Sequence, residues 1–480
     1  MSDKSETYLA EWQQREDLAE RMLPLVGALY RRHGIVVLIH GVSLVQATPL
    51  EIIKAHRFAR RLDGNELPLE DTFEAIVAMT AMDLAPAKVD VGKLRRNFGR
   101  EGQAGSFGDY VRTALASLNT GREPMRREPQ DVVLYGFGRI GRLMARIIVD
   151  KMGGGEKFRL RAIVVRPGKE GDLQRRASLL RRDSIHGPFK GTIRVDEEDS
   201  ALVINGNMVR VIYANAPEDV DYAQYGIHDA IVVDNTGIWR DREGLGRHLK
   251  SKGVAKVILT APGQGDVPNI VFGVNDDKLP ADATIVSAAS CTTNAIVPVL
   301  KVINDEYGIQ FGHMETVHSY TNDQNLIDNF HKKARRGRAA PLNLVITETG
   351  AAKAVAKALP ELAGKLTGNA IRVPTPNVSL AILNLTLGKP ITKAELNDHL
   401  RRASIDSPLQ DQIDYMTSPD IVSSDLVGNR HAGIIDATAT ITDDNRCVLY
   451  VWYDNEFGYS CQVMRLVQHM AGVRPPHIPG

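Results

Sequence analysis

The feature that most constrains the fold is a glycine loop, Gly136-Phe137-Gly138-Arg139-Ile140-Gly141. It follows a short β-rich run at residues 132–135 and leads into a helical pattern at residues 142–151. In that position the first glycine permits a tight turn, the second lets a pyrophosphate approach the backbone, and the third lets helix and strand pack closely. The loop therefore predicts a dinucleotide-binding α/β domain. The alternative is a glycine-rich turn that holds no ligand.

The chain beyond this loop alternates between β-rich runs and helical patterns. Further β-rich runs lie at residues 160–165, 208–213, 230–233, 256–259 and 269–274. Strands that alternate with helices predict a parallel sheet with crossover connections.

The first part of the chain instead shows helical periodicity and few strand signals. Apolar residues recur at three- and four-residue steps over residues 9–29. Thr48-Pro49-Leu50-Glu51 offers a capping hydroxyl, a proline for the first turn and a glutamate that can reach back. Further helices are predicted at residues 70–82 and 106–118. The charged, proline-rich residues 122–129 indicate a linker. We therefore predict an all-α extension over residues 1–128, either packed on the rest of the chain or acting as an interaction module.

Charge and cysteine usage exclude several classes of function. With 59 basic and 58 acidic side chains the formal net charge is +1, whereas proteins that wrap nucleic acid or lie on anionic membranes usually carry a basic excess. No apolar stretch approaches the ~20 residues that span a bilayer, and the N-terminus lacks the apolar core of a secretory signal. The three cysteines include no Cys-x-x-Cys pair. We therefore expect no nucleic-acid or membrane partner, no metal site, no disulfide framework and a reducing, cytoplasmic location.

Cys291 is the candidate nucleophile. It follows a β-rich run at residues 284–286 and opens an apolar-periodic helix, within Ser290-Cys291-Thr292-Thr293-Asn294. The dipole and free amides of a helix N-terminus favour a thiolate, and thiol pKa values there can fall to about 3.5–7.5. The neighbouring hydroxyls suit an oxyanion or a phosphate. The alternative is a buried and inert cysteine, as we expect for Cys447 and Cys461.

A nucleophilic cysteine needs a base, and the strand-like residues 314–319 carry His318. An imidazole can hold a thiolate as an ion pair and can accept a proton from a carbonyl-derived hydroxyl. Spacing alone does not separate His318 from His186, His313 and His331.

Six motifs occur in one order: the glycine loop, Ser-Cys-Thr-Thr-Asn at 290–294, Thr-Val-His-Ser-Tyr-Thr-Asn-Asp-Gln at 316–324, Thr-Gly-Ala-Ala-Lys-Ala at 349–354, Arg-Val-Pro-Thr-Pro-Asn-Val at 372–378 and Trp-Tyr-Asp-Asn-Glu-Phe-Gly-Tyr at 452–459. Over residues 131–473 the chain closely resembles the phosphorylating glyceraldehyde-3-phosphate dehydrogenase family. The resemblance implies a Rossmann-type domain over residues 129–290, completed by a C-terminal helix at 460–473, an α+β catalytic domain over residues 291–459, and a homotetramer.

The resemblance also implies residue roles, with Cys291 as nucleophile and His318 as its base. The substrate's own phosphate would meet Thr321, Asp323 and Arg372. Inorganic phosphate would meet Ser290, Thr292, Thr349 and Gly350, with Arg336 nearby. The cofactor would meet Gly136, Gly138, Arg139, Ile140 and Gly141 in the glycine loop, Thr236 and Gly237 along the cleft, and Asn455 and Tyr459 at the nicotinamide.

The resemblance implies the phosphorylating oxidation of D-glyceraldehyde 3-phosphate to 1,3-bisphosphoglycerate with reduction of NAD(P), and the residue types suit the chemistry of that reaction. Thiolate addition gives a hemithioacetal, the base accepts its proton as hydride leaves, and phosphate attacks the resulting thioester. One alternative is a dehydrogenase for erythrose 4-phosphate or a related phosphorylated aldose. Another is a regulatory or scaffold protein on the same fold, which loss of Cys291, His318 or Arg372 would have favoured. The sequence does not show whether the flux is glycolytic or gluconeogenic.

The cofactor preference departs from the NAD-specific pattern of the family. A carboxylate is expected after the second strand, about 20 residues beyond the loop, to bind the ribose hydroxyls. Here Arg166-Pro167-Gly168-Lys169 occupies that place, and Asn329-Phe330 replaces a Leu-Pro pair of NAD-specific bacterial members. Cations there would attract a 2′-phosphate, although solvated loop charges are the alternative. We predict that NADP is used well, alone or beside NAD.

Overall fold

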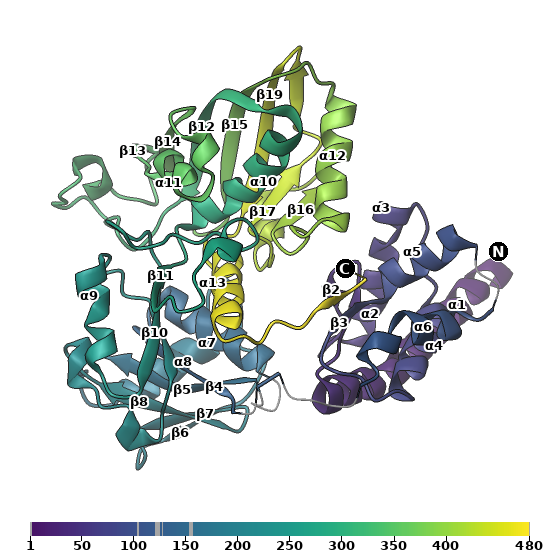
Figure 1. Cartoon of the computed structure of the whole chain (residues 1–480), viewed down its shortest axis with the longest axis horizontal. Helices are drawn as coiled ribbons and strands as arrows, with labels where there is room; N and C mark the ends of the chain where they lie inside the picture. Colours follow the sequence, from purple (N-terminus) through teal and green to yellow (C-terminus); the bar gives the residue numbers. More distant parts are fainter. Residues whose placement is uncertain (1, 103–104, 121–124, 127, 153–156, 480) are drawn as a thin grey trace. The chain divides into compact units, whose positions relative to one another are not determined.

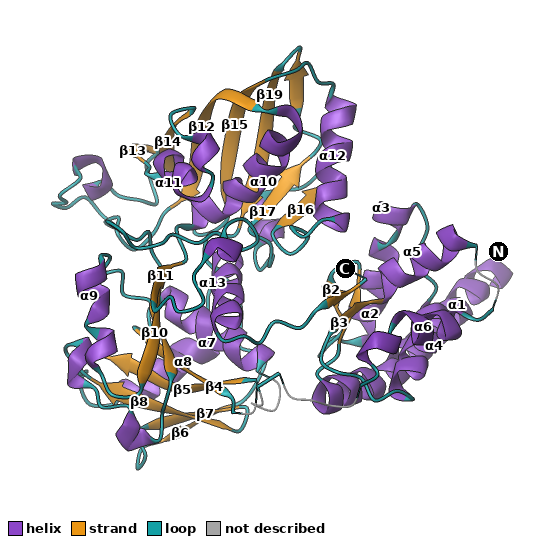
Figure 2. Cartoon of the chain, in the orientation of Figure 1, coloured by secondary structure: helices purple, strands orange, loops and turns teal. Residues whose placement is uncertain are grey.

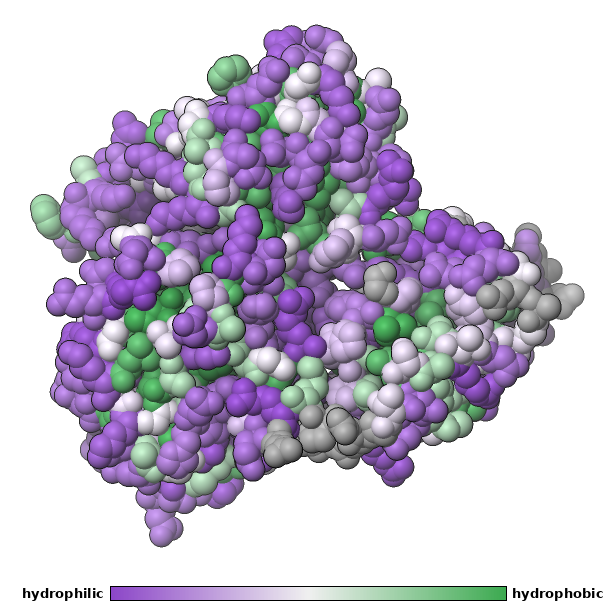
Figure 3. Space-filling model, in the orientation of Figure 1, coloured by the Kyte–Doolittle hydropathy of each residue, from purple (hydrophilic) through white to green (hydrophobic). Residues whose placement is uncertain are grey.

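The computed structural model describes residues 2–102, 105–120, 125–126, 128–152 and 157–479 (Figure 1). The chain forms two compact units. The first consists of Met1–Pro129, Gly153–Lys157 and Gly472–Gly480, and the second of Gln130–Met152 and Phe158–Ala471. On the face shown in Figure 3 most of the surface is hydrophilic, because the larger apolar side chains are mostly buried in the cores.

The first unit is mainly helical. Its helices are α1 (Ser2–Ala28), α2 (Pro49–Phe58), α3 (Arg60–Asp63), α4 (Leu69–Thr80), α5 (Val91–Glu101) and α6 (Phe107–Ala114). The predicted start of α2 is confirmed, because the Glu51 amide donates to Thr48 Oγ1 at 3.3 Å and the Thr48 amide donates to Glu51 Oε2 at 2.8 Å. The apolar stripe of α1 is buried from Ala19 onward, whereas Leu9 and Trp12 are exposed.

The first unit also contains a small sheet, which corrects the all-α description of the extension. Its strands are β1 (Val36–Ile39), β2 (Val42–Ser43), β3 (Lys88–Asp90) and β20 (His477–Ile478), in the order β2-β1-β3-β20. Figure 2 labels β2 and β3 among the helices of this unit. β3 pairs in parallel with both β1 and β20. Strands of two to four residues are too short to show a periodic pattern, and one of them comes from the far end of the chain. The predicted helices are confirmed, but the sheet was not predicted.

The second unit begins with a doubly wound sheet of order β11-β10-β9-β4-β5-β8-β7-β6. Its strands are β4 (Gln130–Tyr135), β5 (Phe158–Val165), β6 (Ile193–Asp196), β7 (Ala201–Ile204), β8 (Asn207–Tyr213), β9 (Ala230–Asp234), β10 (Val254–Leu259) and β11 (Ile285–Ser287). Neighbouring strands pair in parallel across the part of the sheet that runs β11-β10-β9-β4-β5-β8. Helices α7 (Arg139–Lys151), α8 (Asp172–Arg181) and α9 (Arg242–Gly246) lie between strands in the sequence. The strand order reverses between β4 and β9, which is where such sheets bind ligands.

The β-rich run at residues 269–274 is not a strand, so that prediction is wrong. Only one isolated bridge forms there, between Asn269 and Ser287. The Val271 amide donates to a side chain, Asn275 Oδ1, at 2.8 Å, and is therefore not available to pair with a neighbouring strand. Gly273 has φ of +87°, which turns the chain out of an extended path.

A second sheet of the same unit has the order β13-β14-β12-β15-β19-β17-β16, with β18 paired to β19. Its strands are β12 (Ile309–Ser319), β13 (Val345–Glu348), β14 (Leu366–Val373), β15 (Ser379–Leu387), β16 (Ile413–Met416), β17 (Gly433–Asp436), β18 (Ile441–Asp443) and β19 (Arg446–Tyr453). The accompanying helices are α10 (Cys291–Tyr307), α11 (Ala351–Ala358), α12 (Lys393–Asp406) and α13 (Phe457–Met470). α10 packs on this sheet, and α13 packs against α7.

Candidate active site

The candidate nucleophile is held by a strand–turn–helix connection. β11 ends at Ser287, and Cys291 is the first residue of α10. Ser290 caps the helix, because its Oγ accepts from the Thr293 amide at 3.1 Å. Cys291 Sγ lies 3.5 Å from Nε2 of His318. The helix start therefore places the thiol within reach of an imidazole.

His318 is oriented by its other ring nitrogen. Nδ1 donates to the carbonyl oxygen of Ser319 at 2.7 Å, so the proton of the neutral ring is on Nδ1. Nε2 is then an acceptor that faces the Cys291 thiol. This is the arrangement that a general base requires.

Tyr453 supports this pair and was not predicted. Its hydroxyl lies 2.9 Å from Thr292 Oγ1 and 2.7 Å from Thr316 Oγ1, and its ring packs edge-on against His318 at 5.9 Å between centroids. The Thr292 hydroxyl, which we expected beside inorganic phosphate, is therefore buried against Tyr453. Tyr453 lies in the motif at residues 452–459, but its contacts are far away in sequence.

Burial controls the protonation of the pair. It raises the pKa of the Cys291 thiol, and the charge of Arg372 opposes this with a smaller effect. Burial, followed by the charge of Arg372, lowers the pKa of His318 to about 3. The direction for the thiol is opposite to the one that a helix N-terminus alone predicts. Burial thus favours the neutral form of both groups, so the thiol proton must leave before sulfur attacks.

A cluster of cationic and hydroxyl side chains adjoins the pair at the end of β14. Arg372 stands opposite His318 in the parallel β12–β14 register. Its Nη1 donates to the Ser319 carbonyl and to Thr321 Oγ1, both at 3.1 Å. Its buried Nε has no hydrogen-bond partner among the described residues. An unpaired buried guanidinium donor beside a nucleophile fits an anionic ligand.

Asp323 and Arg336 complete this cluster. The Asp323 carboxylate accepts hydrogen bonds from Thr321 and Arg336, and Arg336 Nε donates to Thr347 Oγ1 at 3.1 Å. Burial raises the pKa of Asp323, but the hydrogen bond from Thr321 and the charges of Arg336 and Arg372 bring it below its usual value. Two guanidinium groups against one carboxylate leave the cluster positive.

The other predicted phosphate residues lie at helix starts. Ser290 Oγ and Thr293 Oγ1 are 2.7 Å apart. Gly350 immediately precedes α11, and Thr349 Oγ1 accepts from the Ala351 amide at 3.2 Å. A Cβ added at Gly350 would meet nothing within 4 Å, so this helix start is open.

The glycine loop has the geometry that a dinucleotide requires. Gly136 has φ of +92°, which favours glycine. A Cβ at Gly141 would lie 2.3 Å from the Gly136 carbonyl oxygen, so helix and strand are in close contact there. A Cβ at Gly138 would meet nothing within 4 Å, which leaves space at the start of α7 for a pyrophosphate on the helix amides. The residues present therefore fit a nicotinamide dinucleotide.

Three carboxylates accept hydrogen bonds from residues in and beside this loop, and the sequence predicted no role for any of the three. Arg139 Nε and Nη2 donate to Glu456 at 2.5 Å, and its two Nη groups donate to Asp183 at 3.1 and 3.3 Å. Thr236 N–H and Oγ1 donate to Asp234 at 2.7 and 2.6 Å, which shapes the turn before Gly237. Ile140 follows Arg139 in the first turn of α7.

The predicted nicotinamide residues lie near the nucleophile's turn. Asn455 Oδ1 accepts from Ser379 Oγ at 2.9 Å. The Tyr459 hydroxyl donates to the Ala289 carbonyl at 3.0 Å, two residues before Cys291. Both side chains are buried. α13 is thereby tied to the start of α10.

Arg166 is the first residue after β5 and is exposed. Lys169 is exposed in the same loop. Glu170 is exposed beside Lys169, and Asp172, the first residue of α8, is paired with Arg176 at 2.5 Å. The structure thus keeps cations at the end of the second strand.

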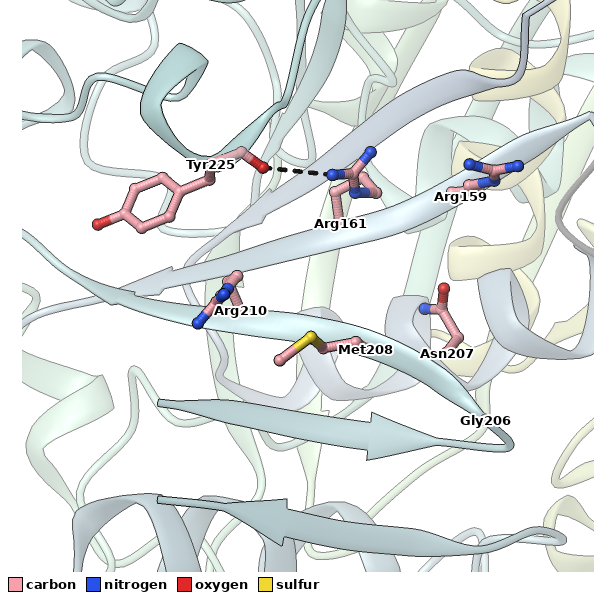
Figure 4. Close-up of a pocket in the computed structure, with 7 residues that line it drawn as sticks. All are labelled: Arg159, Arg161, Gly206, Asn207, Met208, Arg210 and Tyr225. Atoms are coloured by element: carbon pink, nitrogen blue, oxygen red, sulfur yellow. Dashed lines mark hydrogen bonds between the residues drawn. The ribbon is translucent and has the colours of Figure 1, made fainter. Parts of the chain in front are cut away.

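A separate recess lies at the amino ends of β5 and β8, away from the glycine loop (Figure 4). Its arginines are already engaged, because Arg161 pairs with Asp131 at 3.2 Å and Arg210 with Asp199 at 2.8 Å. Arg161 is the extra residue of a β-bulge in the β4–β5 register, which directs its side chain. This recess is not part of the candidate active site.

Within the described residues, no group of three or more histidine, cysteine or acidic side chains is arranged to hold a metal ion. In the same part of the chain, no helix combines the length and apolarity needed to cross a membrane. Cys291, Cys447 and Cys461 are all free, and the last two are buried.

Two family descriptions match this chain. Residues 130–242 match "Glyceraldehyde 3-phosphate dehydrogenase, NAD binding domain", and residues 290–455 match "Glyceraldehyde 3-phosphate dehydrogenase, C-terminal domain". A "Glyceraldehyde-3-phosphate dehydrogenase-like protein" of Pseudomonas aeruginosa is 61% identical over 95% of this chain and 100% of its own length. "Glyceraldehyde-3-phosphate dehydrogenase 2" of Bacillus subtilis is 42% identical over 71% of this chain and 96% of its own. The "Glyceraldehyde-3-phosphate dehydrogenase" of Borreliella burgdorferi is 40% identical over 71% of this chain and 99% of its own length.

Proposed function

The chain belongs to the glyceraldehyde-3-phosphate dehydrogenase family of oxidoreductases, and from this we propose that it oxidises D-glyceraldehyde 3-phosphate to 1,3-bisphosphoglycerate with reduction of NAD(P). The observation that carries the proposal is the 3.5 Å contact between Cys291 Sγ and His318 Nε2. This contact lies beside Arg372, whose free Nε donor suits a phosphate.

The residues would act in a simple order. Cys291 sulfur bonds to the aldehyde carbon while its proton passes to Nε2 of His318 and from there to the carbonyl oxygen, which gives a hemithioacetal and leaves His318 neutral again. His318 then takes the hemithioacetal hydroxyl proton during oxidation to a thioester. A bound nicotinamide supplies the hydride acceptor. Inorganic phosphate attacks the thioester carbon, the acyl phosphate leaves, and the sulfur is released.

Arg372 and Thr321, with Asp323 and Arg336 behind them, would hold the substrate's phosphate. Ser290, Thr349 and Gly350 would serve the attacking phosphate. Steady-state kinetics test the assignment: turnover of glyceraldehyde 3-phosphate should require inorganic phosphate. Turnover without phosphate, or a higher kcat/KM for erythrose 4-phosphate, would contradict it.

Cofactor choice is a second part of the proposal, in which Arg166 favours NADP or the use of both cofactors. The side chain is exposed directly after β5, where a 2′-phosphate would be bound. Arg166→Asp should lower kcat/KM for NADP by about tenfold relative to NAD. Arg194→Asp, at the exposed residue of β6, is the control. A strong NAD preference of the unaltered enzyme would mean that Arg166 is only a surface charge.

We also propose a homotetramer. Leu326, Ile327, Phe330, Leu342 and Leu344 expose between 72% and 91% of their surface in one segment of the second unit. Exposed apolar clusters of this kind are typical of subunit contacts. Light scattering should give four copies, and Phe330→Asp should reduce that number, whereas Leu179→Asp on α8 should not. The cytoplasmic location also stays a prediction, supported by the three free cysteines.

A further inference from the structure

His186 has no part in the chemistry above, yet it is among the most enclosed polar side chains near the cleft. It lies in the loop between α8 and β6, with 5% of its side chain exposed. The loop is fixed because Asp183 Oδ1 accepts from the amides of Ile185 and His186, both at 2.9 Å. The ring therefore has a defined place and direction.

Polar groups from four parts of the unit face this ring, and all but Asn377 are charged. On the Nδ1 side lie Arg139 Nη2 at 3.4 Å, Asp183 Oδ1 at 3.5 Å and Glu456 Oε2 at 3.8 Å. On the Nε2 side lie Asp454 Oδ2 and Asn377 Nδ2, both at 3.3 Å. The Phe457 ring packs beside it, 5.9 Å away between centroids. His186 thus stands between Arg139 of the glycine loop and Asp454 of the turn before α13.

Asp454 organises the turn that carries Asn455. Its Oδ1 accepts from the amides of Glu456 and Phe457 at 2.9 and 2.8 Å, and its Oδ2 accepts from the Gly428 amide at 2.8 Å. Burial raises the pKa of Asp454, but hydrogen bonds that include one from His186 hold it below its usual value. Since Asp454 precedes Asn455 directly, a shift of this carboxylate would move Asn455.

We propose that His186 is a positioning residue that ties the glycine loop to the Asn455 turn, so that the pyrophosphate and nicotinamide ends of the cofactor cleft keep one geometry. With its proton on Nε2, the ring accepts from Arg139 and donates to Asp454. The inference rests on the proposed function, because that function assigns the two ends of the cleft to one dinucleotide.

Two substitutions distinguish the contact of His186 with Arg139 from its contact with Asp454. His186→Asn keeps polar atoms near the place of Nδ1 but cannot reach Asp454, whereas His186→Gln reaches Asp454 and gives up only the contact to Arg139. Arg139 is also held by Glu456 and Asp183, so H186Q should retain most of the function. His313→Asn is the matched control, because His313 pairs with Thr367 and Glu315 on the catalytic sheet.

Calorimetric titration of the full-length variants with NAD and with NADP tests the proposal, together with steady-state kinetics. H186N should raise the cofactor Kd and KM by about tenfold and leave the aldehyde KM within about twofold, with H186Q between H186N and the unaltered protein. H186N and H186Q that bind both cofactors as tightly as the unaltered protein would overturn it. So would equal losses of cofactor and aldehyde affinity, which indicate a general structural role. An unaltered protein that binds neither dinucleotide would instead refute the proposed function.

Discussion

At the scale of single residues, the candidate active site depends on one buried pair and the charge beside it. A thiol in apolar surroundings is a poor nucleophile, because burial disfavours the thiolate. At Cys291 the charge of Arg372 is the largest effect that opposes burial, ahead of hydrogen bonds from Thr292. In the proposed function the same guanidinium would donate hydrogen bonds to an anionic substrate, so one residue would serve both binding and activation.

Cys291→Ser should abolish most turnover while leaving cofactor binding intact. A serine hydroxyl is much less acidic than a thiol, so we expect kcat to fall by about 10³-fold or more. Steady-state kinetics measures the loss of turnover, and cofactor titration measures whether binding is retained. Cys447→Ala, which alters a cysteine on β19 buried in the second sheet's core, is the control and should retain turnover. A C291S enzyme with near-normal kcat would refute the assignment of the nucleophile.

Arg372→Gln should shift the pH dependence of Cys291 alkylation upward. A nearby positive charge lowers a thiol pKa, so its removal raises that pKa and slows alkylation at any fixed pH below it. We expect the midpoint of the iodoacetamide rate to move to higher pH. Arg338→Gln, whose side chain pairs with Asp328 at the surface, should leave the profile unchanged. An unchanged or lowered midpoint in R372Q would contradict the role of Arg372.

At the scale of secondary-structure elements, local patterns predicted most strands of the first sheet of the second unit, but only β12 of its second sheet. The glycine loop, β4 and α7 were predicted because the residues that make the turn are adjacent in sequence. The strand predicted at residues 269–274 is absent because the Val271 amide donates to the Asn275 side chain and not to a neighbouring strand. The β-forming composition of this run does not reveal that contact. Tyr453 and Glu456 were missed because their partners, Thr292 and Arg139, are 161 and 317 residues away. Contacts of that kind depend on the fold and not on spacing.

Two glycine substitutions should separate the loop's role in folding from its role in binding. A methyl group at Gly138 meets no atom of the chain within 4 Å, so Gly138→Ala should keep the melting temperature within about 1 °C. That methyl group would occupy the pyrophosphate's space, so cofactor Kd should rise about tenfold or more.

Gly141→Ala is the matched comparison. Its methyl group would lie 2.3 Å from the Gly136 carbonyl oxygen, and overpacking of this kind costs about 1–3 kcal/mol. G141A should therefore melt at a lower temperature even without cofactor. Thermal unfolding and titration measure both effects. Normal cofactor affinity in G138A would show that the space over α7 is not the pyrophosphate site.

At the scale of the whole molecule, the N-terminal extension is not joined to the rest by a single linker. The chain enters the second unit after Pro129 and returns to the first at Gly472. There the Lys88 amide donates to the Pro476 carbonyl at 2.8 Å, and Ile478 packs against the extension's core. The similarity to the Pseudomonas aeruginosa protein spans 95% of this chain, so it includes most of this unit. The two ends of the chain together build one sheet.

Removing residues 475–480 should therefore weaken the first unit and spare the chemistry of the second. The deletion removes β20, the Pro476 acceptor and the Ile478 side chain, which together contribute about 2 kcal/mol. Calorimetric melting should show the first unit unfolding at a lower temperature, with kcat within about twofold of the full chain. Ile478→Ala should reproduce part of the loss, whereas Ile441→Ala, at an exposed position on β18, should not. If the shortened chain melts like the full chain, the C-terminal strand adds no stability. If its turnover collapses instead, the active site depends on the extension, and the extension is more than an appended unit.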